Sequence, residues 1–128
     1  MSKFLSAAGF HGAVAVGFGA WAAHGAEAVL PPQAIDWVKT GASYQLWHAL
    51  ALLGIAAFLH ASPPRLAVRL VTISGLAFFL GALLFSGSLY LLAWDGPSFV
   101  VYLTPIGGGL LILGWLLLLI AGVKKGSI

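Results

Sequence analysis

The chain has 128 residues, of which 61% are hydrophobic and only 7% are charged, and its formal net charge is +3. A water-soluble domain carries about 25% charged residues, so this chain cannot cover a water-facing surface. Because each membrane span needs about 20 residues, several spans leave no room for a separate catalytic domain. Cysteine is absent, which excludes disulfides, thiolate nucleophiles and cysteine metal ligands.

The first apolar stretch covers residues 4–23 and consists mainly of alanine and glycine. Small residues let helices approach closely in lipid, where no hydrophobic force drives them together. We therefore expect this span to pack at the centre of the molecule. The glycines predicted to bring helices together, here and in later spans, are Gly9, Gly12, Gly17, Gly19, Gly87, Gly107 and Gly108.

The longest connection follows, and it places Pro31 and Pro32 ahead of a mixed apolar and polar run. Proline is favourable at a helix start, because the N–H that it lacks would have no partner there. We expect residues 33–41 to form a short interfacial helix in this outer loop, anchored by Trp37, before a second span over residues 43–61.

The third span is predicted over residues 69–93, and a tight turn at Asp95 and Gly96 leads to a fourth over residues 99–123. Pro105 lies in the first half of that fourth span, where a proline removes one backbone hydrogen bond and favours a kink. The predicted fold is an all-α integral membrane protein, a single domain of four transmembrane helices.

The few charged residues are divided unequally between the two sides of this topology. One side carries only basic residues: Lys3, Arg65, Arg69, Lys124 and Lys125. The other side carries mainly acidic ones: Glu27, Asp36, Asp95 and the single basic residue Lys39. Lysine and arginine are in excess on the cytoplasmic side of membrane proteins, so both termini are predicted to be cytoplasmic. The positive net charge then reflects topology, and we expect no nucleic-acid partner.

Polar side chains within the spans are costly in lipid unless they find partners. Counted at about 1.5 Å per residue, most of them fall in one layer within roughly 12 Å of the outer boundary. Its members are His24, Tyr44, Gln45, His48, Ser86, Ser88, Tyr90 and Thr104. Three interpretations stay open: a hydrogen-bond network that holds the helices in register, a pocket in which His48 binds a ligand or relays a proton, and a surface that docks another subunit.

His11 lies about 10 Å from the inner boundary by the same count, and we expect it to make a buried polar contact with a neighbouring helix. No two histidines face each other at equal depth, and no metal-binding spacing occurs. His24 and His48 could hold zinc only with Glu27 or Asp36 from the loop, so we expect no cofactor and no metal. Familiar catalytic motifs are missing, and no catalytic residue is assigned. An enzyme acting on a lipid or quinone through His48 is a third and weaker hypothesis.

Six short motifs occur in a fixed order along the chain. They are Gly19-Ala20-Trp21-Ala22-Ala23-His24, Trp37-Val38-Lys39-Thr40-Gly41, Tyr44-Gln45-x-x-His48, Leu84-Phe85-Ser86-Gly87-Ser88-Leu89-Tyr90, Thr104-Pro105-x-Gly107-Gly108 and Gly114-Trp115. With these motifs the chain resembles the bacterial domain-of-unknown-function 423 family, whose eukaryotic relative is transmembrane protein 256. The resemblance implies a small four-span protein of a bacterial inner membrane, without an established biochemical role. One departure is Trp21-Ala22, where the family tends to have Phe-Gly.

The main hypothesis is a noncatalytic membrane protein that acts by helix–helix association, as a homo-oligomer or as an accessory or assembly subunit of a membrane complex. The alternative is a transporter of small solutes or protons, or a ligand-binding protein, that uses the polar layer around His48. The expected partners are membrane lipids and other transmembrane helices. A cavity that reaches His48 and Tyr90 would favour binding, whereas direct hydrogen bonds that fill the space would favour a structural network.

Overall fold

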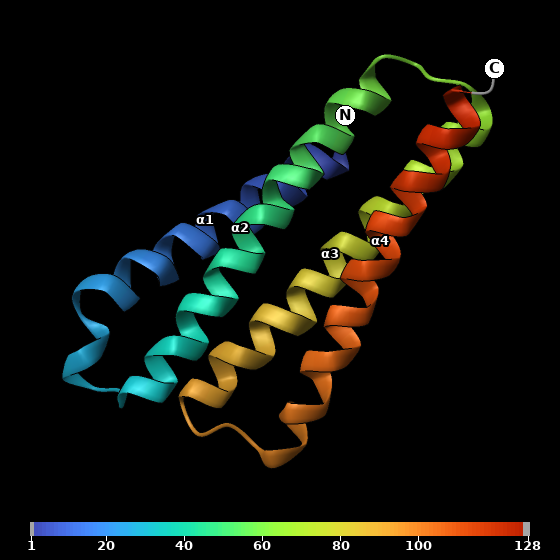
Figure 1. Cartoon of the computed structure of the whole chain (residues 1–128). Coiled ribbons are helices and arrows are strands. Elements are labelled where there is room, and N and C mark those ends of the chain that lie inside the picture. The colour runs from blue at the N-terminus through green and yellow to red at the C-terminus, as the bar shows by residue number, and fades with distance from the viewer. Residues whose placement is uncertain (1, 127–128) are drawn as a thin grey trace.

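The protein, seen here in a computed structural model that describes residues 2–126, is built from helices. Its elements are α1 (Lys3–His24), the 3-10 turn η1 (Ala26–Ala28), α2 (Pro32–His60), α3 (Arg65–Ala93), the 3-10 turn η2 (Ser98–Tyr102) and α4 (Leu103–Gly126). The four long helices form an elongated bundle (Figure 1). Each is long and apolar enough to cross a membrane, with η2 counted as part of the last span. The prediction of an all-α chain with four helices long and apolar enough to span a membrane is confirmed.

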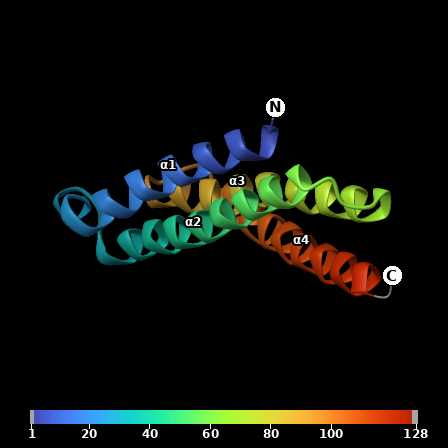
Figure 2. The same cartoon turned by 90° about the horizontal axis from the view of Figure 1, so that it is seen from above.

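Helices α2 and α3 lie in the middle of the bundle. Helix α1 packs along α2 and helix α4 packs along α3, on opposite sides of the central pair (Figure 2). Among the described residues, no Cα atom of α2 lies within 8 Å of one in α4. The alanine-rich α1 is therefore an outer helix and not the central one that its small residues led us to expect.

Helix α2 begins at Pro32, well before the predicted start of the second span at residue 43. The segment 33–41, predicted as a separate interfacial helix, forms the first turns of α2, and the helix continues through Ser43 without a break. Its 29 residues span about 43 Å. That exceeds the hydrocarbon core of about 30 Å, so α2 either tilts or extends beyond the core.

The fourth span starts differently from the prediction. The 3-10 turn Ser98–Tyr102 comes first, and α4 begins only at Leu103. Pro105 therefore lies in the first turn of α4, where backbone N–H groups have no partner within the helix. The proline marks a helix start rather than an interior kink.

Glycines bring α3 and α4 together. A Cβ atom added at Gly81 would lie 2.8 Å from Leu111 Cδ2 and 3.0 Å from the Gly107 carbonyl oxygen, and one at Gly107 would meet the Phe85 backbone. Of the glycines predicted to pack, a neighbouring helix lies within 4 Å of the added atom at Gly12, Gly19, Gly107 and Gly108. Open space surrounds it at Gly9, Gly17 and Gly87. Glycine content therefore does not show which face of a helix is packed.

Two apolar clusters fill the bundle. One contains Leu52 and Phe78 and extends toward the α2–α3 turn, and the other contains Val38 and Ala93 and lies toward the opposite end. The buried polar side chains of α1 and α2, including Gln45, lie between these clusters.

Candidate functional site

A chain of hydrogen bonds joins three helices. The Tyr90 hydroxyl of α3 donates to Gln45 Oε1 of α2 at 2.7 Å. The amide nitrogen of Gln45 then donates to His11 Nδ1 of α1 at 2.9 Å, and His11 Nε2 donates to the carbonyl oxygen of Phe79 in α3 at 3.2 Å. Gln45 is 3% exposed and His11 is fully buried. One amide side chain thus couples α1, α2 and α3.

His11 and Gln45 meet because they lie at the same depth. Each is thirteen residues from the same end of the bundle, counted from His24 in α1 and from Pro32 in α2. Because α2 begins at Pro32 and not at residue 43, Gln45 lies about 20 Å from the start of its helix. His11 therefore belongs to the same polar layer as Gln45.

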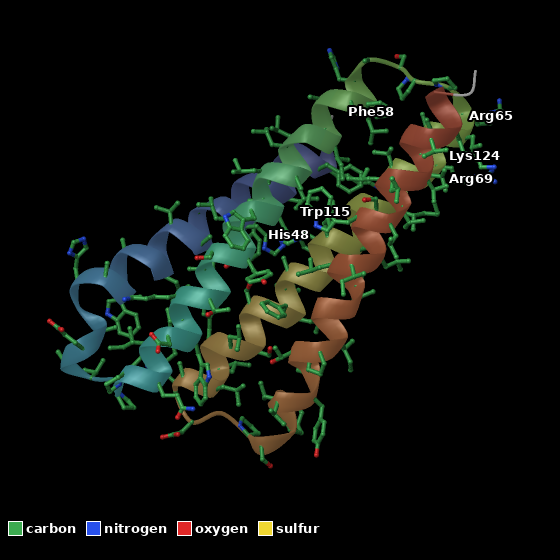
Figure 3. All side chains as sticks on the ribbon, viewed as in Figure 1. His48, Phe58, Arg65, Arg69, Trp115 and Lys124 are labelled. Atoms are coloured by element: carbon green, nitrogen blue, oxygen red, sulfur yellow. The ribbon has the colours of Figure 1, made fainter. Side chains whose placement is uncertain are left out.

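A second histidine links α2 to α4. The Trp115 indole N–H, which can only donate, bonds to His48 Nε2 at 3.0 Å. His48 Nδ1 donates to the Tyr44 carbonyl oxygen one turn earlier, at 2.7 Å. The Phe78 ring packs against both rings, with centroids 5.2 Å from His48 and 4.8 Å from Trp115. Figure 3 shows His48 and Trp115 facing each other between α2 and α4.

Serine hydroxyls bond to backbone carbonyls of neighbouring helices where glycines allow a close approach. Ser86 of α3 donates to the Gly41 carbonyl of α2 at 2.7 Å. Ser74 of α3 donates to the Gly114 carbonyl of α4, also at 2.7 Å. Both serines are fully buried. These two hydrogen bonds join α3 to α2 and to α4.

The remaining predicted polar residues differ in how they take part. The hydroxyls of Ser88 and Thr104 lie 2.6 Å apart and join α3 to α4. Tyr44 contributes its carbonyl oxygen, while its ring packs on Phe85 with centroids 4.8 Å apart. His24 is exposed at the end of α1, and its imidazole has no hydrogen-bond partner among the described residues. The structure thus separates His24 from the other members of the predicted layer.

Three residues whose side chains hydrogen-bond between helices were not among the predicted layer residues: His11, Ser74 and Trp115. His11 was expected to make a buried contact, but its depth was counted from the inner boundary, which concealed its match with Gln45. The sequence did not predict the hydrogen bond of Trp115 to His48, because a tryptophan within an apolar run shows neither the direction of its side chain nor its partner. Counting α1 and α2 from their common outer end would have identified the first pair.

The buried polar side chains of this arrangement find their partners within the protein. Every buried side-chain nitrogen and oxygen atom in the described part of the chain has a partner. The imidazoles of His11 and His48 each use one nitrogen as donor and the other as acceptor, which is the pattern of the neutral ring. A proton added at His11 Nδ1 or His48 Nε2 would break the bond that joins the ring to Gln45 of α2 or to Trp115 of α4. Within residues 2–126, no group of three or more metal-binding side chains is close enough to hold an ion.

Comparison with known proteins identifies relatives along nearly the whole chain. The sequence profile of a family described as "Protein of unknown function (DUF423)" matches residues 18–108. A UPF0382 membrane protein of Haemophilus influenzae is 39% identical, over 99% of this chain and 98% of the relative. The UPF0382 membrane protein YwdK of Bacillus subtilis is 36% identical over 97% and 98% of the two chains. The UPF0382 inner membrane protein YgdD of Escherichia coli K12 is 35% identical over 96% and 92%. No solved structure matches.

Proposed function

The chain belongs to the DUF423 family of membrane proteins, and we propose that it acts without catalysis, by binding a second copy of itself or another subunit of a membrane complex. One observation carries this proposal: every buried side-chain nitrogen and oxygen atom of the described residues already has a hydrogen-bond partner within the protein. The outer surface of the bundle, which contacts lipid or the helices of other proteins, is then the part that can bind a partner. The names of the relatives give a membrane location and no activity.

The same pairing disfavours the transport hypothesis. A solute that crosses the layer would have to replace hydrogen bonds that the buried side chains of the described residues already make. His48, the residue best suited to this role, is held between the Tyr44 carbonyl and the Trp115 indole. Gln45 is likewise held between Tyr90 and His11.

Exposed aromatic residues on α2 mark the surface that we assign to association. Trp47 is 55% exposed and lies near the middle of α2, and the Tyr44 ring packs beside it with centroids 5.0 Å apart. Tryptophan and tyrosine that contact lipid concentrate at the membrane–water interfaces, whereas those in protein interfaces occupy the centre of the contact. An exposed aromatic pair supplies the kind of contact that forms the centre of a protein interface, and this supports a protein partner.

We also propose that the protein lies in a bacterial inner membrane with both termini in the cytoplasm. The inner-membrane name of the Escherichia coli relative supports the location. Arg65, Arg69 and Lys124 gather at one end of the bundle (Figure 3), and the acidic residues lie in the first turns of α2 and in loops toward the other end. Because the chain has no cysteine, an exposed Ser98→Cys variant should react with a membrane-impermeant thiol reagent from the periplasmic side. Reaction only after the membrane is broken would contradict the orientation.

The association proposal is tested by crosslinking in native membranes. A photoreactive amino acid at Trp47 should give one protein adduct of defined mass. The matched control is the same substitution at Leu119 of α4, which is 61% exposed and lies away from the aromatic pair; it should give no discrete adduct. If both positions crosslink only to lipid, the proposed surface is wrong.

A further inference from the structure

A pocket lies between the start of α2 and the end of α3, at the acidic end of the bundle (Figure 1). Its volume is about 360 Å³, and its walls include Gln33 and Trp37 of α2 and Ala93, Trp94 and Asp95 at the end of α3. Sites for small molecules have volumes of about 300–1,000 Å³. The pocket therefore has room for a small ligand or for the headgroup of a lipid.

Asp95 is held in the wall of this pocket by the turn that ends α3. Its N–H donates to the Leu92 carbonyl at 3.2 Å, and the N–H of Gly96 donates to the Leu91 carbonyl at 2.8 Å. Asp95 has a φ of 55°, the left-handed conformation in which glycine or asparagine usually ends a helix. Its carboxylate makes no hydrogen bond or ion pair with another described residue, Lys39 included. The turn thus fixes an unpaired carboxylate at the pocket.

The end of α3 favours a positive group beside this carboxylate. The C-terminus of a helix carries partial negative charge, so it stabilises a cation and destabilises an anion. Asp95 adds a full negative charge two residues beyond the last residue of α3. Four residues after Ala93 stands Pro97, which has no N–H to donate to the Ala93 carbonyl. A cation in the pocket therefore meets the Asp95 carboxylate and the carbonyl end of the helix together.

Two indole rings contribute to the same pocket. Trp94 stacks on Trp21, with ring centroids 5.0 Å apart and planes 14° from parallel. This contact holds the Trp94 ring, while 47% of the residue stays exposed. Trp37 is half-buried and packs against the cluster that contains Val38 and Ala93. Tryptophan attracts cations more strongly than other aromatic side chains, and aromatic walls are a common means of recognising ammonium groups.

These features select one class of cation. A metal ion needs several oxygen, nitrogen or sulfur ligands, and within residues 2–126 no group of three or more metal-binding side chains occurs. A quaternary ammonium has no N–H to donate to a carboxylate or a carbonyl, whereas a primary ammonium donates three hydrogen bonds. We propose that this pocket binds a primary ammonium group, with Asp95 as its charge partner and Trp37 and Trp94 as its aromatic walls. An ethanolamine lipid headgroup and a small water-soluble amine both carry this group.

Fluorine NMR of the whole protein, labelled with 5-fluorotryptophan and placed in phosphatidylcholine discs, tests the proposal. The chain has five tryptophans, and the single variants Trp37→Phe and Trp94→Phe assign the two resonances of the pocket. Added ethanolamine should shift both resonances until they saturate, whereas tetramethylammonium at the same concentration and pH should not. If the lipid headgroup is the ligand, exchanging half of the phosphatidylcholine for phosphatidylethanolamine should shift them in the same direction and weaken the response to free ethanolamine.

Asp95→Asn tests the charge partner. Asparagine is favoured in the left-handed position, so the variant should fold, and the loss of one charge-assisted hydrogen bond should weaken ethanolamine binding by at least about tenfold. The matched control is Asp36→Asn, the same change at an exposed residue of the same end that does not line the pocket, and it should bind like the unmodified chain. No shift with either amine source, an equal response to tetramethylammonium, or equal affinities of Asp95→Asn and Asp36→Asn would overturn the proposal.

Discussion

Replacing Gln45 with leucine removes the side chain that joins α1, α2 and α3, and the structure sets the expected cost. The substitution keeps similar volume but breaks the bonds from Tyr90 and to His11. It leaves the Tyr90 hydroxyl and His11 Nδ1 without partners in a site where Tyr90 is 7% exposed and His11 is fully buried. Two bonds of average strength in a membrane protein, about 0.6 kcal/mol each, give a lower bound near 1 kcal/mol. Two orphaned buried groups, at about 1–3 kcal/mol each, raise the estimate, and we expect a loss of about 2–4 kcal/mol.

The free energy of unfolding in mild detergent or bicelles measures this loss. Gln33→Leu is the matched control, because Gln33 is exposed in the first turn of α2, and it should change stability by less than about 0.5 kcal/mol. Adding Tyr90→Phe to Gln45→Leu removes one of the two orphaned groups, so the double variant should be no less stable than Gln45→Leu alone. Equal stability of Gln45→Leu and Gln33→Leu, or additive losses in the double variant, would refute the hydrogen-bond chain.

Three more substitutions and one control substitution test the contacts between other helices by thermal unfolding in detergent. Gly81→Ala forces a methyl group against α4 and should lower the free energy of unfolding by about 1–3 kcal/mol. In the control, Gly109→Ala, the methyl group points into open space, so this variant should be as stable as the unmodified protein or more stable by up to about 1 kcal/mol. Equal melting temperatures of the two variants would contradict the close α3–α4 contact. Ser86→Ala removes the hydroxyl donor to α2 and should cost about 0.6–1.7 kcal/mol, and no loss would mean that the bond contributes nothing. Trp115→Phe keeps the aromatic packing but leaves His48 Nε2 without a donor, for a loss of about 1–2 kcal/mol; an unchanged melting temperature would argue against the α2–α4 link.

The fold could be predicted because lipid restricts which secondary structures a chain can form. A backbone without water must satisfy its own hydrogen bonds, so four long apolar stretches indicate four helices. The helix ends were harder to predict, since hydropathy marks the membrane and not the end of a helix. The polar first turns of α2 looked like a separate segment for that reason, although Pro32 signalled a helix start.

The polar network could be predicted in kind but not in detail. Buried polar groups in lipid need partners, so pairing among the layer residues was the expected outcome. The individual pairs depend on depth and rotation, which composition does not give: His11 reaches Gln45 only because α2 starts early, and Trp115 reaches His48 only because it turns toward α2. The sequence also does not tell which glycines are packed. A Cβ atom added at Gly114 would meet the Phe78 ring, whereas one added at Gly9 would meet nothing within 4 Å.

The most direct test of action by association is the mass and protein composition of the particle that contains this chain when it is extracted, with its surrounding lipid, from native membranes. We expect two or more copies, or one copy with a defined membrane partner in a fixed ratio. Trp47→Leu should return the particle to a single chain without changing its helix content. A single chain with lipid alone, from the unmodified protein, would contradict the proposal that this protein acts by binding other membrane proteins.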